Sequence, residues 1–277
     1  MVKINVSAVL GILVFSMSPA YGGPVIFSVF GPDAASITVT RDAFRVAIGG
    51  GTVAGGNRLF GGVRREINWD AVPDAFSAPN NLPANFFNVN SPRGVVFFTP
   101  GTGFQVSANA GVAPIQFDNI NPTYSATFEP FSPQKLFTSL GSNVLDVNFF
   151  LPGTNTTGST NAFGVIFSDV DVANTTSLQF FDPSNNSLGS FFVPAGAGNQ
   201  TFSFLGVQFT TERIGRVRIT SGNVAVGPND APPTSDVVTM DDFIYAEVTV
   251  PEPTSMLLIS GGLIVLGLLA RKKLYWR

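Results

Sequence analysis

The 277-residue sequence contains no cysteine and no histidine, and each absence excludes a class of chemistry. Without histidine there can be no Ser-His-Asp or Cys-His catalysis and no histidine-ligated zinc. The missing cysteine fits an exported protein that does not use disulfides for its stability. An enzyme would have to use a pair of carboxylates, and nothing in the spacing of the acidic residues selects one pair over another. We therefore expect the protein to be non-catalytic.

Charged residues are scarce, and acidic residues outnumber basic ones. Only 12% of the residues are Asp, Glu, Lys or Arg, and residues 21–249 carry 10 basic and 17 acidic side chains, a net of −7. A chain this acidic has no cationic surface that could displace counterions from phosphate, so nucleic acid is excluded as a partner. The sequence is instead rich in Phe (27), Gly (29) and Pro (20). This composition is typical of stacked antiparallel sheets with many turns.

Period-two patterns dominate the middle of the chain. Leu145, Val147 and Phe149 alternate with Asp146 and Asn148, which indicates a strand with one buried face. Similar alternating or apolar segments recur at 25–30, 36–48, 94–99, 103–107, 163–167, 177–181, 188–193, 202–209, 213–220 and 237–249. No convincing amphipathic helix separates them. The pattern predicts an all-β fold, an antiparallel β-sandwich of jelly-roll-like form.

The first 20 residues have the pattern of a signal peptide. Lys3 supplies a positive start, residues 4–17 are mostly apolar, and Ser18-Pro19-Ala20 places small residues before a cut at Tyr21. An uncut N-terminal anchor is the alternative. With the signal peptide removed, residues 21–249 remain as one extracellular β-sandwich domain.

The last 28 residues, 250–277, fall into three parts. Pro251-Glu252-Pro253 forms a stiff tract that can continue neither a strand nor a helix. Residues 255–270 are uncharged and almost wholly apolar, about 24 Å as a helix. This run is short against the ~20 residues of a usual transmembrane helix, but local bilayer thinning allows it to span. A basic tail, 271–277, follows and stays cytoplasmic. The basic stop consists of Arg271, Lys272 and Lys273.

This order of parts resembles the PEP-CTERM sorting signal of Gram-negative bacteria. The resemblance covers residues 250–277 and implies that the protein is an exosortase substrate, cleaved near the Pro251-Glu252-Pro253 motif. It implies export, a transient anchor in the inner membrane, and transfer to the cell surface or the extracellular matrix. A C-terminal anchor that is never processed is the alternative interpretation.

Acidic residues at expected strand ends suggest a structural metal. Asp242 lies among apolar neighbours on the last strand, and a carboxylate on a core face must be paired, hydrogen-bonded or metal-bound. Calcium takes about six to eight oxygen ligands, which loop ends can supply. The candidate calcium ligands are Asp70, Asp169, Asp171 and Asp242. For Asp242 two alternatives stay open: a bond to backbone N–H or to Arg, and a β-bulge that shifts the alternation.

Aromatic residues supply the candidate ligand-binding site. Trp69 and Tyr245 could stack against the sugar rings of a glycan, which requires exposed ring faces flanked by polar residues. The alternative is that these rings lie in the core, because a sandwich with this many aromatic residues must bury most of them.

The sequence thus predicts a non-catalytic, exported surface or matrix protein that is sorted and processed by exosortase and interacts with extracellular polysaccharide. Two other functions stay open. One is a carboxylate-dependent enzyme acting on glycans, and the other is a purely structural matrix protein without a specific ligand.

Overall fold

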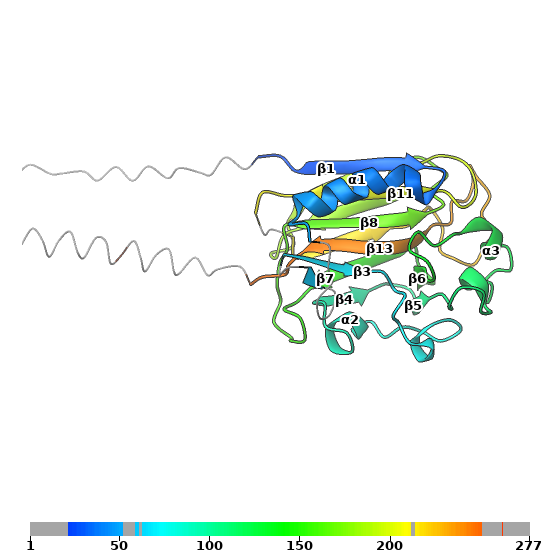
Figure 1. Ribbon diagram of the computed structural model, residues 1–277, viewed down its shortest axis with the longest axis horizontal. Coiled ribbons are helices and arrows are strands. Elements are labelled where there is room, and N and C mark those ends of the chain that lie inside the picture. The colour runs from blue at the N-terminus through cyan, green and yellow to red at the C-terminus, as the bar shows by residue number, and fades with distance from the viewer. Residues whose placement is uncertain (1–21, 52–58, 61–62, 212–213, 251–261, 263–277) are drawn as a thin grey trace, which may run out of the picture.

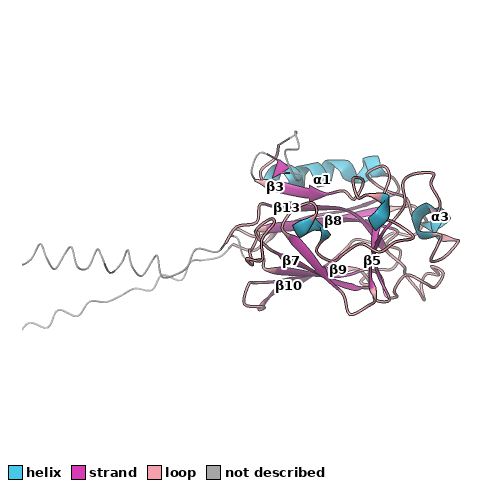
Figure 2. Ribbon diagram, turned by 90° about the horizontal axis from the view of Figure 1, so that it is seen from below, coloured by secondary structure: helices cyan, strands magenta, loops and turns pink. Residues whose placement is uncertain are grey.

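The computed structural model describes residues 22–51, 59–60, 63–211, 214–250 and 262, and these form two antiparallel sheets with few helices (Figures 1 and 2). The expected signal peptide at 1–20 lies outside the described residues. The sorting motif and the apolar span at 255–270 also lie outside them, apart from Gly262. Within the described ranges no helix is long and apolar enough to cross a membrane.

The larger sheet has eight strands. They are β1 (Val25–Gly31), β2 (Leu59–Phe60), β3 (Arg64–Ile67), β5 (Gly103–Val106), β6 (Phe137–Leu140), β8 (Ala162–Ser168), β11 (Phe202–Gln208) and β13 (Thr239–Ala246). The order is β1-β11-β8-β13-β3-β2, and β6 joins β5 to β13. All of these pairings are antiparallel.

The smaller sheet has five strands in the order β10-β9-β12-β7-β4. Its strands are β4 (Val95–Phe98), β7 (Val144–Phe149), β9 (Ser177–Phe181), β10 (Ser187–Phe192) and β12 (Arg216–Thr220). The expected alternation of β7 is present, since Leu145, Val147 and Phe149 are buried in the core. The prediction of two antiparallel sheets is confirmed in a structure that is mostly β with a few helices, whereas the jelly-roll form stays a prediction.

Apolar side chains from both sheets form one core between them. Phe163 and Phe167 of β8 belong to the same buried cluster as Val217 and Ile219 of β12. At one end of this core Trp69 stacks on Phe137, with ring centroids 4.0 Å apart. Burying large aromatic side chains of this kind contributes roughly 1.5–3 kcal/mol each. This core between the sheets is the largest of three buried apolar clusters in the described residues.

A helix covers the outer face of the larger sheet, where the sequence pattern predicted a strand at 36–48. Helix α1 (Ala34–Ala47) packs against β1 and β11. The carboxylate of Asp33 accepts a hydrogen bond from Ser36 N at 2.8 Å and caps the helix. Ile37, Phe44 and Ile48 are its buried residues, a spacing typical of one helical face. The strand prediction was wrong because other β-branched residues of this segment, such as Val39 and Val46, lie on its solvent side, where they do not pack into a sheet.

Two facing glycines make room for this helix. Gly164 of β8 and Gly206 of β11 are directly paired, and the ring of Phe44 lies over both. A Cβ atom at Gly206 would lie 2.8 Å from Cδ2 of Phe44, closer than real Cβ contacts. The close approach of α1 to the sheet therefore depends on these two positions lacking side chains.

Short helices lie outside the sheets. They are α2 (Phe86–Val89), α3 (Tyr124–Thr127) and two 3₁₀ turns, η2 (Asp74–Phe76) and η3 (Ile115–Phe117). Tyr124 and Phe117 belong to a small separate apolar cluster with Phe128, Leu136 and Val237. This cluster anchors the long connection from β5 to β6.

Strand register defines two ends of the sandwich. At one end Val25 pairs with Gln208, which pairs with Ala162, and β13 finishes at Ala246 nearby. At the other end Gly31 pairs with Phe202, and Ser168 lies level with both. The described chain therefore begins and leaves at the same end of the sandwich (Figure 1). The turn after Ser168 lies at the opposite end.

Replacing Gly206 by alanine tests the contact between α1 and the sheet. We expect Gly206→Ala to lower the free energy of unfolding by about 1–3 kcal/mol, because the buried rings of Phe44 and Phe204 cannot move away from the added methyl group. Gly23→Ala is the control, since nothing lies within 4 Å of the added atom. Urea denaturation of both variants measures the difference, and equal stabilities would contradict this account.

Candidate functional site

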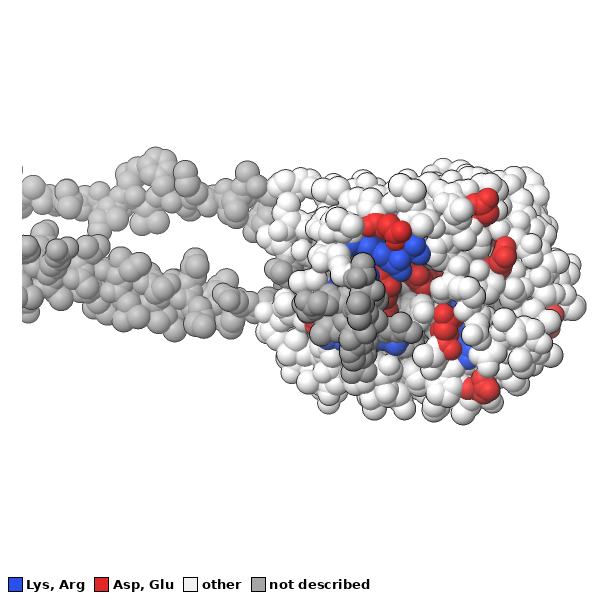
Figure 3. Space-filling model, viewed as in Figure 1, with Lys and Arg blue, Asp and Glu red and all other residues white. Residues whose placement is uncertain are grey.

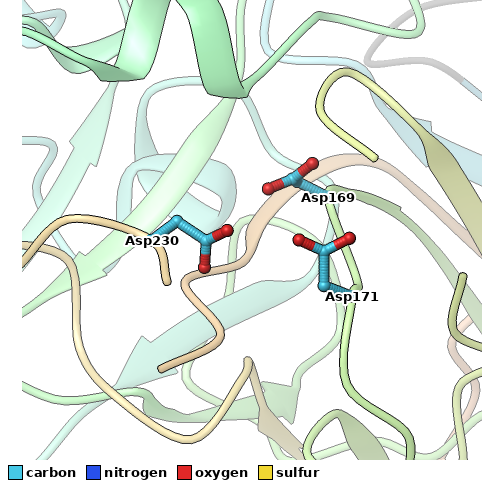
Figure 4. A group of neighbouring side chains, drawn as sticks. All are labelled: Asp169, Asp171 and Asp230. Atoms are coloured by element: carbon cyan, nitrogen blue, oxygen red, sulfur yellow. The ribbon is translucent and has the colours of Figure 1, made fainter. Parts of the chain in front are cut away.

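Three aspartates meet at the end of the sandwich defined by Ser168. Asp169 and Asp171 follow β8, and Asp230 comes from the long connection between β12 and β13. Each offers one carboxylate oxygen, and these oxygens all lie within 4.8 Å of one another. Figure 4 shows the three carboxylates pointing toward a common space.

Asp169 is the unusual member of this cluster. Its side chain is 0% exposed, and neither carboxylate oxygen has a hydrogen-bond donor among the described residues. The amide of nearby Gln200 donates to Thr127 O instead, at 2.8 Å. Burial, together with the negative charges of Asp171 and Asp230, raises the pKa of Asp169 to about 9. A buried carboxylate without donors is costly and requires a compensating partner.

The neighbouring carboxylates are only partly satisfied. Asp171 accepts a hydrogen bond from Gly198 N at 2.9 Å, and Asp230 accepts one from Val237 N at 2.9 Å. A fourth carboxylate, Asp236, is buried beside them and accepts from the amide of Asp171 at 3.0 Å. Burial and the like charges nearby raise the pKa of Asp230 to about 6 and also raise the pKa of Asp236.

In the described part of the chain, no positive side chain forms an ion pair with these carboxylates. Among the described residues, none of the ion pairs formed by Lys or Arg involves Asp169, Asp171, Asp230 or Asp236. Four carboxylates therefore share one end of the sandwich without a protein cation. The arrangement has the oxygen donors and the excess negative charge that a hard metal cation requires.

The structure thus brings together two of the four candidate calcium ligands, Asp169 and Asp171. Their third neighbour, Asp230, was missed because it lies about 60 residues later in a loop without periodicity. Asp70 lies elsewhere and accepts hydrogen bonds from Asn68 Nδ2 at 3.0 Å and from Lys135 N at 3.2 Å.

Asp242 also lies elsewhere, on a β-bulge of β13. The register of β13 shifts between Met240 and Phe243, so both of these side chains face the inter-sheet core, while Ile244 packs under α1. Asp242 lies on the helix side and is 3.6 Å from the guanidinium of Arg45. The bulge is therefore present, and Arg45 supplies an ion pair, although Asp242 Oδ1 accepts no hydrogen bond from the described residues.

Arg45 connects Asp242 to a buried charge network. Its guanidinium binds both carboxylate oxygens of Glu66, at 2.7 and 2.9 Å, and Arg64 binds Glu66 at 3.0 Å. Figure 3 shows blue and red atoms gathered beside α1 and β3 on an otherwise mostly uncharged face. The charged residues of β3 in this network are buried, since Arg64 is 2% exposed and Glu66 is 7% exposed. The network is a structural ion pair cluster beneath the helix.

Trp69 and Tyr245 are core residues and not a stacking platform. They are 1% and 0% exposed. Trp69 stacks on Phe137 and donates from Nε1 to Asp241 O at 2.8 Å, while the hydroxyl of Tyr245 donates to Arg93 O at 2.8 Å. Neither ring presents a face to a sugar, which corrects the prediction for these two residues.

The spacing from Ser132 to Lys135 matches the Ser-x-x-Lys pattern of some serine hydrolases. In the structure the two side chains have separate partners. Ser132 Oγ binds Asp241 Oδ1 at 2.9 Å, whereas Lys135 Nζ binds Val72 O and Ser77 Oγ. Burial lowers the pKa of Lys135, but Lys135 and Ser77 are 0% and 1% exposed. This arrangement gives Ser132 no base and gives Ser77 no access to a substrate.

The comparisons with known proteins concern the C-terminal end. A family model described as the PEP-CTERM protein-sorting motif matches residues 249–273. The chain is a PEP-CTERM protein. The motif implies exosortase as the processing partner of this PEP-CTERM protein, and it implies export with membrane-associated sorting to the cell envelope. The motif residues Pro251, Glu252 and Pro253 and the basic stop at 271–273 lie outside the described residues.

The other two comparisons concern the chain as a whole. None of the curated proteins compared with the chain matches it. Among solved structures, the enzymatically active domain of tailspike protein 4 from bacteriophage CBA120 aligns with 12% identity and a TM-score of 0.23. The alignment covers 60% of this chain and 20% of that one. A likeness this low carries no argument about fold or activity.

Removing Arg45 tests the buried charge network. We expect Arg45→Met to lower the free energy of unfolding by roughly 3 kcal/mol, because Glu66 and Asp242 would remain buried without their main counter-charge. The measurement is urea denaturation of the purified protein.

Arg41→Met, one turn earlier on α1, is the matched control. Arg41 pairs with the half-exposed Asp42 and lies over the ring of Phe131 at 4.8 Å, but no buried carboxylate depends on it, so its removal should cost less, about 1–2 kcal/mol. If the two variants lose the same stability, Arg45 has no special role beneath the helix.

Proposed function

We propose that this PEP-CTERM protein is a non-catalytic surface or matrix protein of the cell envelope. The observation that carries the proposal is the sorting motif at 249–273. In this proposal residues 1–20 direct export, residues 255–270 hold the protein transiently in the inner membrane, and exosortase then cleaves near Pro251-Glu252-Pro253. The sandwich, 21–249, is the part that is delivered.

The absence of catalysis is supported by the state of the carboxylates. Glu66 is held by Arg45 and Arg64, and Glu247 is held by Arg65 at 2.9 Å. Both glutamates are therefore held in ion pairs and are not free to act as the acid and base of a glycosidase, and the chain has no histidine.

Contact with extracellular polysaccharide remains part of the proposal, with different residues from those expected. With Trp69 and Tyr245 in the core, the aromatic side chains at the described surface include Phe98 and Phe192, 58% and 55% exposed. Each ends a strand at an edge of the smaller sheet. A glycan array probed with the purified protein tests this contact, and binding to no glycan would favour the purely structural alternative.

A change in the sorting motif tests the proposed processing. We expect Glu252→Ala to leave the protein at its full-length mass in the membrane fraction of cells that contain exosortase, because the motif that exosortase recognises is broken. The wild type should lose its C-terminal tail. Mass spectrometry of the fractionated protein measures both.

Glu129→Ala is the matched control for this experiment. It removes an exposed glutamate for which no described ion pair exists, and it leaves the motif unchanged. This variant should be processed like the wild type. Normal processing of Glu252→Ala, or a wild type that keeps its tail in the native host, would contradict the proposal.

A further inference from the structure

We propose that Asp169, Asp171 and Asp230 bind a calcium ion at the end of the sandwich opposite to the point where Val250 leaves it. The site does not depend on exosortase sorting. The argument uses the geometry of the three carboxylates, the burial of Asp169, and the chemistry of the donors.

The geometry of the oxygens fits a single ion. Calcium binds its oxygen ligands at about 2.3–2.6 Å, so two ligands of one ion lie no more than about 5 Å apart. One oxygen from each of the three aspartates satisfies this limit, since all lie within 4.8 Å of one another (Figure 4). Only small movements of the three side chains would therefore be needed for all of these oxygens to contact one ion.

Asp169 provides an independent reason to expect a ligand. Its carboxylate is fully buried, is directed into the cluster, and lacks any hydrogen-bond donor among the described residues. Buried polar groups in native proteins nearly always have a partner, and an exception calls for an ion or a water. Since Asp171 and Asp230 add negative charge beside it, the missing partner should be a cation.

The donor set selects the type of cation. All available ligands are carboxylate and carbonyl oxygens, and the chain has no histidine or cysteine with which to favour zinc or copper. Magnesium requires near-octahedral geometry and retains most of its water, whereas calcium accepts irregular sets of six to eight oxygens. Three carboxylates on two loops, one of them fully buried, match calcium better.

The ion would join segments that are far apart in the sequence. Asp169 and Asp171 follow β8, and Asp230 belongs to the connection that leads into β13. Asp171 also accepts a hydrogen bond from Gly198 N, and Asp236 accepts one from the amide of Asp171, so three connections between strands converge here. Calcium should therefore stabilise this end of the sandwich as a unit.

Thermal melting of the full chain in a nonionic detergent tests the proposal, after removal of metals with EGTA. Extracellular calcium modules bind with dissociation constants on the order of 10⁻⁴–10⁻³ M. With calcium at about 100 times the dissociation constant, the melting temperature should rise by roughly 5–10 °C. Magnesium at the same concentration and ionic strength should give a clearly smaller shift.

Substitutions locate the site. Asp169→Asn, Asp171→Asn and Asp230→Asn should each remove most of the calcium-dependent shift, while the melting temperature of each variant in EGTA shows whether it still folds. Asp242→Asn is the control: it changes a buried aspartate that is paired with Arg45, and it should keep the full shift.

Three results would overturn the proposal. The first is a wild-type melting temperature that calcium does not change. The second is a full calcium shift in both Asp169→Asn and Asp171→Asn, and the third is an equal shift from magnesium. Because these measurements do not involve exosortase, their failure leaves the sorting proposal intact, and an unprocessed tail leaves the calcium site intact.

Discussion

The burial of β13 on both of its faces is the constraint on which the rest of the structure depends. One face contributes to the core between the sheets, and the other lies under α1. Two adjacent aspartates in this strand, Asp241 and Asp242, therefore need partners inside the protein. Asp241 accepts hydrogen bonds from the amides of Phe131 and Ser132, and Asp242 lies beside Arg45. The bulge between Met240 and Phe243 makes this possible, because it keeps both apolar neighbours in the inter-sheet core.

The sequence predicted the strands well where one face of the strand is buried and the other is exposed to solvent. The alternation of Leu145, Val147 and Phe149 with polar residues located β7 (Val144–Phe149), and the segments 177–181 and 188–193 match β9 (Ser177–Phe181) and β10 (Ser187–Phe192). The pattern failed for α1, where valine and threonine on the exposed side suggested a strand. The stronger signals were Asp33 at the start of the helix and Gly49 after its end, which mark helix boundaries.

Side-chain roles could be predicted only in part, because they depend on which segments meet. The acidic pair after β8 was identified from the sequence, but its partner Asp230 is fixed by a loop that carries no pattern. Alternation along β13 was misleading for Asp242, since a bulge of one residue reverses the face of every later side chain. The sequence around Trp69 and Tyr245 does not determine whether these rings are buried, because aromatic rings from distant parts of the chain cover them.

The position of β13 has a mechanical consequence. It is the last strand before the C-terminal tract, and it pairs with β8 along one edge and with β3 and β6 along the other. Tension applied at Val250 acts along the strand, so hydrogen bonds on both edges resist it at the same time in shear and do not open one after another. A sandwich held at a cell surface by its C-terminal end would thus bear flow or adhesive load through its best-supported strand.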